Sequence, residues 1–153
     1  MANTYTQIHL HIIFAVKYRQ ALIHPEWKTR LHQYITGIVR NHDHKMLCIN
    51  TMPDHLHMLI GFRPHQSLAD LMSKVKGESS EWINLEHLTK KRFRWQEGYG
   101  AFSYSKNLVH TVANYIEKQE QHHRKKTFLE EYTDLLDKFE VEYDERYIFR
   151  MAE

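Results

Sequence analysis

Four histidines stand in two closely similar tripeptides, His9 and His11 in 9-HLH-11 and His55 and His57 in 55-HLH-57. Residues two apart in an extended strand point to the same side, so each pair presents two imidazoles on one face. Two neutral imidazoles held in this way can bind a divalent metal and leave coordination positions open for substrate oxygens. The chain has 13 histidines, so such a pair also arises by chance, and a metal site needs a third ligand.

The segment 115-YIEKQ-119 offers that ligand, because Tyr115 and Gln119 are four residues apart and share one face of a helix. A tyrosine hydroxyl is a poor nucleophile at neutral pH, but a nearby divalent metal that polarises a phosphate makes attack on that phosphate feasible. The same spacing is also consistent with a partly buried aromatic ring and a solvent-facing amide. The helix by itself leaves both interpretations open.

The elements that carry these residues follow a βαββαβ order. The hydrophobic patterns and turn residues predict strands at 5–16, 45–52, 55–62 and 92–105, of which the second and third form a hairpin. They predict helices at 25–42, over about 17 residues from Ser67, and at 107–126. This order predicts an α+β fold with a ferredoxin-like antiparallel sheet, two helices on one face and an additional C-terminal helix.

The parity of the strands places both histidine pairs on one sheet face. In each strand the histidines alternate with the apolar residues that face the helices, such as Ile12 in the first and Met58 in the third. The first and third strands are neighbours in a βαββαβ sheet, so we expect four imidazoles to gather on the face away from the first two helices.

The composition predicts one domain with an acidic tail. A chain of 153 residues, 42% of them hydrophobic, suffices for one core, and no run approaches the length of a membrane span, so a cytoplasmic protein without membrane association is expected. Residues 1–126 hold 18 basic against 10 acidic residues, whereas 127–153 hold nine acidic against three. Apolar residues at helical spacing in 127–153 predict a helical tail docked on the domain formed by 1–126.

Basic clusters interleaved with aromatic residues predict a nucleic-acid surface. Such clusters are also common as solvated lysines and arginines, and that alternative stays open. The candidates for phosphate contacts are Lys17, Arg19, Lys90, Lys91, Arg92, Arg124 and Lys125.

The combination of a proline-led 53-PDHLH-57 with 115-YIEKQ-119 resembles the single-tyrosine HUH transposases of small bacterial insertion sequences, the IS200-like transposases. Each motif is modest alone, but together they cover the chain from about residue 5 to residue 126. Three further stretches are similar to that family: 11-HIIFAVKYR-19, 65-HQSLADLMSKVKGESS-80 and 95-WQEGYGAFSYS-105.

The resemblance implies that His55, His57 and Gln119 hold a Mg²⁺ or Mn²⁺ ion and that Tyr115 attacks the scissile phosphate of single-stranded DNA. A 5′-phosphotyrosine then forms, and a 3′-hydroxyl is released. The resemblance further implies a homodimer that recognises hairpins at the ends of the element. Only 53-PDHLH-57 matches the metal motif in place, so His9 and His11 are expected beside it, contacting a DNA phosphate or a residue that holds the metal.

Two other functions remain open from the sequence. A non-cleaving module for single-stranded nucleic acid could use the same scaffold, with aromatic side chains that stack on bases. A metal-dependent phosphodiesterase could activate a water molecule and leave Tyr115 with a structural role. A domesticated relative of a transposase would keep the same residues, so the sequence does not separate it from an active element.

Overall fold

The computed structural model describes residues 3–148, built around a four-stranded antiparallel sheet in the order β2-β3-β1-β4. The strands are β1 (His9–Ala15), β2 (Lys45–Met52), β3 (His55–Gly61) and β4 (Gly100–Tyr104). The helices are α1 (Pro25–Asn41), α2 (Leu68–Leu85), α3 (Val109–Glu117), α4 (Gln119–His122) and α5 (Phe128–Lys138), with short 3₁₀ turns η1 (Lys17–Arg19), η2 (Lys106–Leu108) and η3 (Glu145–Tyr147). The predicted ferredoxin-like α+β sheet is confirmed.

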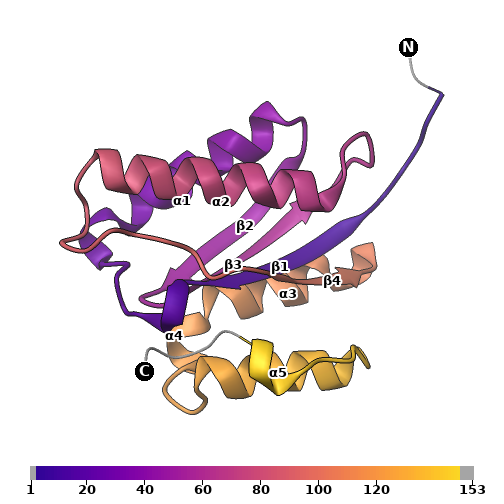
Figure 1. Cartoon of the computed structure of the whole chain (residues 1–153). Helices are drawn as coiled ribbons and strands as arrows, with labels where there is room; N and C mark the ends of the chain where they lie inside the picture. Colours follow the sequence, from indigo (N-terminus) through magenta and orange to yellow (C-terminus); the bar gives the residue numbers. More distant parts are fainter. Residues whose placement is uncertain (1–2, 149–153) are drawn as a thin grey trace.

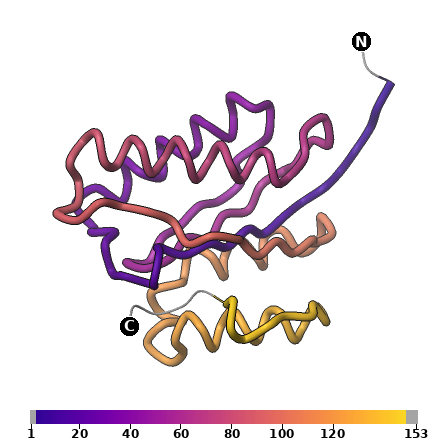
Figure 2. The backbone as a smooth tube through the Cα atoms, viewed as in Figure 1, coloured from indigo at the N-terminus to yellow at the C-terminus, as the bar shows by residue number. Residues whose placement is uncertain are grey.

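Helices cover both faces of the sheet (Figure 1). Figures 1 and 2 show α1 and α2 on one face and α3, α4 and α5 on the other. Side chains alternate along each strand, so Ile12 and Met58 enter the core under α1 and α2, while His11 and His57 face α3 and α5. No helix among the described residues is long and apolar enough to cross a membrane.

The core under α1 and α2 is the larger one. Its buried residues, at most 7% exposed, are Ile12, Phe14, Val16, Ile23, Trp27, Leu31, Ile35, Ile38, Val39, Leu56, Met58, Ile60, Leu71, Met72, Val75, Ile83, Phe93 and Trp95. The second face carries two smaller apolar clusters. One packs Val112 and Ile116 of α3 on Leu59, and histidines lie between it and the cluster under α5. This division leaves one face to stabilise the fold and makes room for polar groups on the other.

The cluster under α5 joins that helix to β1 and β4. Its buried members are Ile13, Ala15, Phe102, Phe128, Tyr132 and Leu136. The ring of Tyr132 lies against the backbone of Gly100, where an added Cβ would stand 2.6 Å from Cε1 of the ring. Glycine at this position therefore allows α5 to approach the edge strand closely.

Two predicted elements are shorter than expected. The predicted strand 5–16 begins only at His9, because the partner strands end there: His9 pairs with Gly61 on one side and with Tyr104 on the other. The predicted strand 92–105 is regular only from Gly100 onward, because Gly98 turns the backbone with a φ of +85°.

The predicted helix 107–126 is interrupted. Lys118 leaves the helical conformation (φ −96°, ψ 22°), so α3 ends at Glu117 and the short α4 starts at Gln119. The basic run 122-HHRKK-126 has no apolar stripe that could pack on the sheet, and helices of this kind gain little from tertiary contacts. The chain therefore turns after His122 and continues into α5.

The segment before β4 is held by side chains of α2. Asn84 donates to the Phe93 carbonyl (3.0 Å) and accepts from the Phe93 amide (2.7 Å). The Trp95 indole donates to the buried Ser79 hydroxyl (2.9 Å). These bonds fix the basic segment 90–94 at the end of β1, where the Lys17 amide donates to the Arg94 carbonyl.

Replacement of Asn84 by alanine should lower the free energy of unfolding by about 1–3 kcal/mol, because two backbone groups of the buried Phe93 lose their partner. Urea denaturation measures the loss, with Glu81→Ala on the exposed side of α2 as the control, expected within about 0.5 kcal/mol of the parent chain. Equal midpoints for the two variants would mean that Asn84 does not hold this segment.

Candidate metal and tyrosine site

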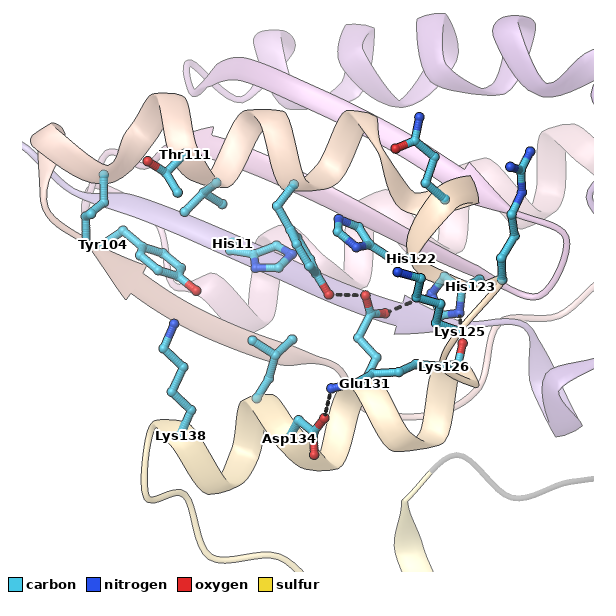
Figure 3. A pocket seen from close by; sticks show the side chains of 16 residues that line it. His11, Tyr104, Thr111, His122, His123, Lys125, Lys126, Glu131, Asp134 and Lys138 are labelled. Carbon is cyan, nitrogen blue, oxygen red and sulfur yellow. Dashed lines mark hydrogen bonds and ion pairs between the residues drawn. The ribbon is translucent and has the colours of Figure 1, made fainter.

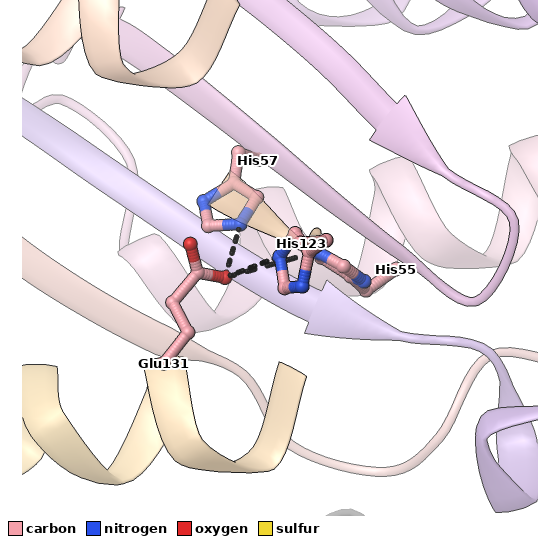
Figure 4. A group of neighbouring side chains, drawn as sticks. All are labelled: His55, His57, His123 and Glu131. Carbon is pink, nitrogen blue, oxygen red and sulfur yellow. Dashed lines mark hydrogen bonds and ion pairs between the residues drawn. The ribbon is translucent and has the colours of Figure 1, made fainter. Parts of the chain in front are cut away.

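Four side chains converge between the sheet and α5 (Figure 4). His55 and His57 come from β3, His123 follows α4, and Glu131 lies on α5. One potential ligand atom from each residue falls within a group whose members all lie within 4.8 Å of one another. The Glu131 Oε1 atom is 3.0 Å from His57 Nε2, 3.1 Å from His123 Nε2 and 3.8 Å from His55 Nε2.

The ring of His55 is oriented by the residue before it. Asp54 accepts a hydrogen bond from His55 Nδ1 at 2.7 Å, which leaves the lone pair of Nε2 directed at the other three side chains. The Asp54 carbonyl in turn accepts from the Val16 amide, so the turn before β3 is tied to the end of β1. The sequence Pro-Asp-His thus supplies both the turn and the group that orients the ligand.

The ring of His57 is oriented by His11 of the neighbouring strand. His11 Nε2 lies 2.8 Å from His57 Nδ1, and the two rings are stacked at 5.1 Å. The Glu131 carboxylate can only accept, so His57 donates to it from Nε2 and accepts from His11 at Nδ1. His9, at the far end of β1 opposite Gly61, has no contact with the cluster among the described interactions.

Tyr115 and Gln119 contact the same carboxylate of Glu131, which Figure 3 shows at the edge of a cavity. The Tyr115 hydroxyl and the Gln119 amide both donate to Glu131 Oε2, the latter at 2.9 Å. Gln119 Oε1 accepts from His123 Nε2 at 2.9 Å. Although α3 and α4 are separate helices, their two side chains therefore reach one point, beside the ring of His57.

Burial and hydrogen bonding shift the protonation of the cluster. Burial lowers the pKa of His57 to about 4, so this imidazole is neutral at pH 7. Burial also raises the pKa of Tyr115, and the nearby Glu131 carboxylate raises it further. Burial would raise the pKa of Glu131, but hydrogen bonds from His123, His57 and Tyr115 outweigh it and hold that pKa well below its ordinary value.

The donor set fits a divalent metal ion. Imidazole nitrogens and a carboxylate oxygen are ligands of Mn²⁺ and of later first-row metals, and a carboxylate also suits Mg²⁺. His57 is neutral and His55 presents a free lone pair, as metal ligation requires. Ligation through His57 Nε2 would replace its hydrogen bond to Glu131. The group His55, His57, His123 and Glu131 is therefore a possible metal site, and its donors leave the identity of the metal open.

The predicted phosphate-binding residues fall in two places. Arg124 and Lys125 line a cavity of about 740 Å³ that also borders Tyr115 and Glu131. A separate basic groove lies at the end of β1 between α2 and the segment before β4, and its wall includes Lys17, Lys90, Lys91, Arg92 and Arg94. Arg19 lies in η1 next to Lys17, with a positive φ of 53°.

Sequence analysis missed two residues of the cluster, His123 and Glu131. Gln119 and His123 are four residues apart, a spacing that could have suggested the contact between them. The basic run 122–126 around His123 points to phosphate contacts and not to a metal ligand. Glu131 had no comparable signal in the sequence. It lies 74 residues after His57, and the contact between them depends on how α5 packs against the sheet.

Comparisons with known proteins identify related chains. The family model described as transposase IS200-like matches residues 4–119. The ISDra2 transposase TnpA of Deinococcus radiodurans is 27% identical over 118 residues, which cover 74% of this chain and 84% of the relative. The transposase for insertion sequence element IS200 of Salmonella typhimurium is 27% identical over 124 residues, which cover 78% and 81%.

Two solved structures share the fold. A crystal structure from Deinococcus radiodurans assigned as a transposase aligns with a TM-score of 0.62 and 23% identity, over 78% of this chain and 95% of that one. A REP-associated tyrosine transposase bound to a REP hairpin aligns with a TM-score of 0.60 and 13% identity, over 80% and 73%. Since the family model spans more than two thirds of the sequence, the chain belongs to the IS200-like transposase family.

Proposed function

We propose that this transposase cuts and rejoins single-stranded DNA through a covalent link to Tyr115. The observation that carries the proposal is the position of the Tyr115 hydroxyl, which shares the Glu131 carboxylate with His57 and Gln119. A nucleophile therefore lies within one hydrogen bond of a cluster that can hold a metal.

The reaction is a transfer of the phosphoryl group from one oxygen to another. The Tyr115 hydroxyl loses its proton as its oxygen attacks the scissile phosphorus, the bond from phosphorus to the 3′ oxygen breaks, and the 3′ oxygen takes up a proton and leaves as a hydroxyl, so no net proton is consumed. The product is a 5′-phosphotyrosine, which keeps the phosphodiester energy. A 3′-hydroxyl from another DNA end can reverse the attack, so strands are joined without ATP.

His55, His57 and Gln119 are the proposed holders of Mg²⁺ or Mn²⁺. When bound, the ion would polarise the phosphate and stabilise the charge that develops on its oxygens. The protein's own contribution is orientation: Asp54 fixes the ring of His55, and His11 fixes the ring of His57. His11 is in this sense a positioning residue, whereas His9 lies at the other end of the strand.

DNA with hairpin ends is the proposed substrate, in line with the structural relative that is described as bound to a REP hairpin. The basic groove with Lys17, Lys90, Lys91 and Arg92 suits the phosphates of such a hairpin, and Arg124 and Lys125 lie nearer Tyr115. A homodimer stays a prediction that the open edge of β4 supports, since an edge strand can pair with a second copy. Tyr115 and His57 of a single chain already lie together.

The variant Tyr115→Phe should retain binding of single-stranded DNA and form no covalent adduct, because the attacking oxygen is removed. Incubation with labelled strands from the genomic flanks and with Mn²⁺, followed by a denaturing gel, detects the adduct. Cleavage by the phenylalanine variant would instead support a water-activating phosphodiesterase. Binding without cleavage by both proteins would support the non-cleaving module.

Replacement of Asp54 by asparagine should weaken Mn²⁺ binding by about 10- to 100-fold, because the His55 ring loses the carboxylate that orients it. Isothermal titration calorimetry measures this affinity without reference to cleavage. Arg63→Ala, an exposed change beyond β3, serves as the control. Equal affinities of the Asp54 variant and the parent would remove His55 from the metal site.

Strand binding should weaken steeply with salt, because phosphate contacts release counterions. Joint replacement of Lys90, Lys91 and Arg92 by alanine should reduce the slope of log K against log salt by about 2, at ~0.7 per lost phosphate contact. Fluorescence anisotropy at several salt concentrations gives the slope. An unchanged slope would assign these three residues to ordinary solvated surface.

A further inference from the structure

We infer that α5 is an acidic lid seated on the surface where the DNA strand binds beside Tyr115, so that the lid and the strand exclude each other. The inference rests on the proposed function, because it assumes that a phosphate must reach Tyr115. It goes beyond that function by identifying the strand-binding surface and the segment of the chain that competes for it.

The first observation is the closure of the site. His57 and Gln119 have no exposed surface, and His55 is 1% exposed. Glu131, which shields them from the side of α5, is 4% exposed. A scissile phosphate carries a nucleotide on each side, so it cannot reach these side chains while α5 is in place.

The second observation is the place that Glu131 occupies. Its two carboxylate oxygens accept from Tyr115, His57, Gln119 and His123. A phosphate that reacts with Tyr115 must bring its own anionic oxygens to the same donors. Two anions at one site repel each other strongly in a buried environment, so the carboxylate has to leave before the phosphate enters.

The third observation is the charge pattern around the lid. The cavity beside Tyr115 is walled by basic residues from the turn after α4, including Arg124, Lys125 and Lys126. Lys126 forms an ion pair with Asp134 of α5, which projects into the same cavity (Figure 3). Acidic groups of α5 thus take positions where these cations would otherwise meet the phosphates of a strand.

The surface under α5 also suits the bases. Ile13 and Ala15 of β1 and Phe102 of β4 lie under Phe128, Tyr132 and Leu136 of the helix. Without α5 this face would present an apolar floor with the rings of Phe102, Tyr104 and His11. Aromatic rings beside a basic wall are the usual platform for stacked bases of a single strand.

The lid is separable from the rest of the molecule. The family model matches residues 4–119, so α5 lies beyond the part of the chain that the family model describes. Residues 123–127 connect α4 to α5, all of them exposed except His123, and the helix has its own N-terminal cap in Thr127 and Glu130. An 11-residue helix is only marginally stable without tertiary contacts, so α5 is expected to fray once it leaves the sheet.

The first test loosens the lid without touching the cluster. Tyr132→Ala removes the ring that packs on Gly100, and Tyr147→Ala, an equal truncation at an exposed position in η3, is the control. An oligo-dT strand should bind the Tyr132 variant about tenfold more tightly than the parent, because the open form becomes more populated. The affinity of the Tyr147 variant should not change.

The second test follows the lid directly by amide hydrogen exchange in the parent chain. Addition of oligo-dT should accelerate exchange of residues 128–138 and leave α1 unchanged. Protection of 128–138 by the strand, or an affinity of the Tyr132 variant equal to that of the parent, would overturn the inference. Accelerated exchange together with the absence of a covalent adduct on strands from the genomic flanks would keep the lid and refute the proposed cleavage.

The third test separates a competing carboxylate from a metal ligand. Glu131→Gln removes the charge and keeps the shape, with Glu142→Gln as a control in the same acidic segment. The Glu131 variant should bind oligo-dT about tenfold more tightly than the parent chain, because the competing charge is removed. Weaker Mn²⁺ binding together with unchanged strand binding would make Glu131 a ligand of the metal and overturn its role in the lid.

Discussion

A carboxylate buried among imidazoles is the constraint on which this face of the molecule depends. An ionised group inside a protein is tolerated only when its lone pairs are satisfied, and Glu131 meets this condition with donors from α3, α4, β3 and the turn after α4. Each of those elements is therefore held in a definite place. Breaking one of these contacts leaves the buried carboxylate without one of its hydrogen-bond donors. The positions of the elements that supply the donors therefore depend on one another.

The two faces of the sheet have different roles: one carries the main hydrophobic core and the other carries the polar site. The core under α1 and α2 is mainly apolar and holds most of the buried hydrophobic residues, and no histidine of the cluster belongs to it. The opposite face has two small apolar clusters with polar groups between them. Because adjacent residues of a strand face opposite sides, Leu56 and Met58 anchor β3 from one side while His55 and His57 are presented on the other.

The sheet and the start of α2 could be predicted from the sequence, because the alternation of side chains along a strand and the helix cap at Ser67 are local signals. The structure confirms both. It also predicted that His11 and His57 share a face, because their strands are neighbours. The break at Lys118 and the contact of Glu131 were missed. The contact of Glu131 depends on packing between segments far apart in the chain, which neither periodicity nor spacing encodes. The roles of Tyr115, His55, His57 and Gln119 in catalysis stay predictions.

The close approach of Tyr132 to Gly100 has a consequence for variation among related chains. No side chain fits between the edge strand and the ring, since even a Cβ would overlap it. A chain that replaced this glycine would have to shrink the residue at position 132 or give up the docked helix. The two positions, 32 residues apart in sequence, are therefore expected to change together: covariation between them would mark the relatives that carry a helix in this place.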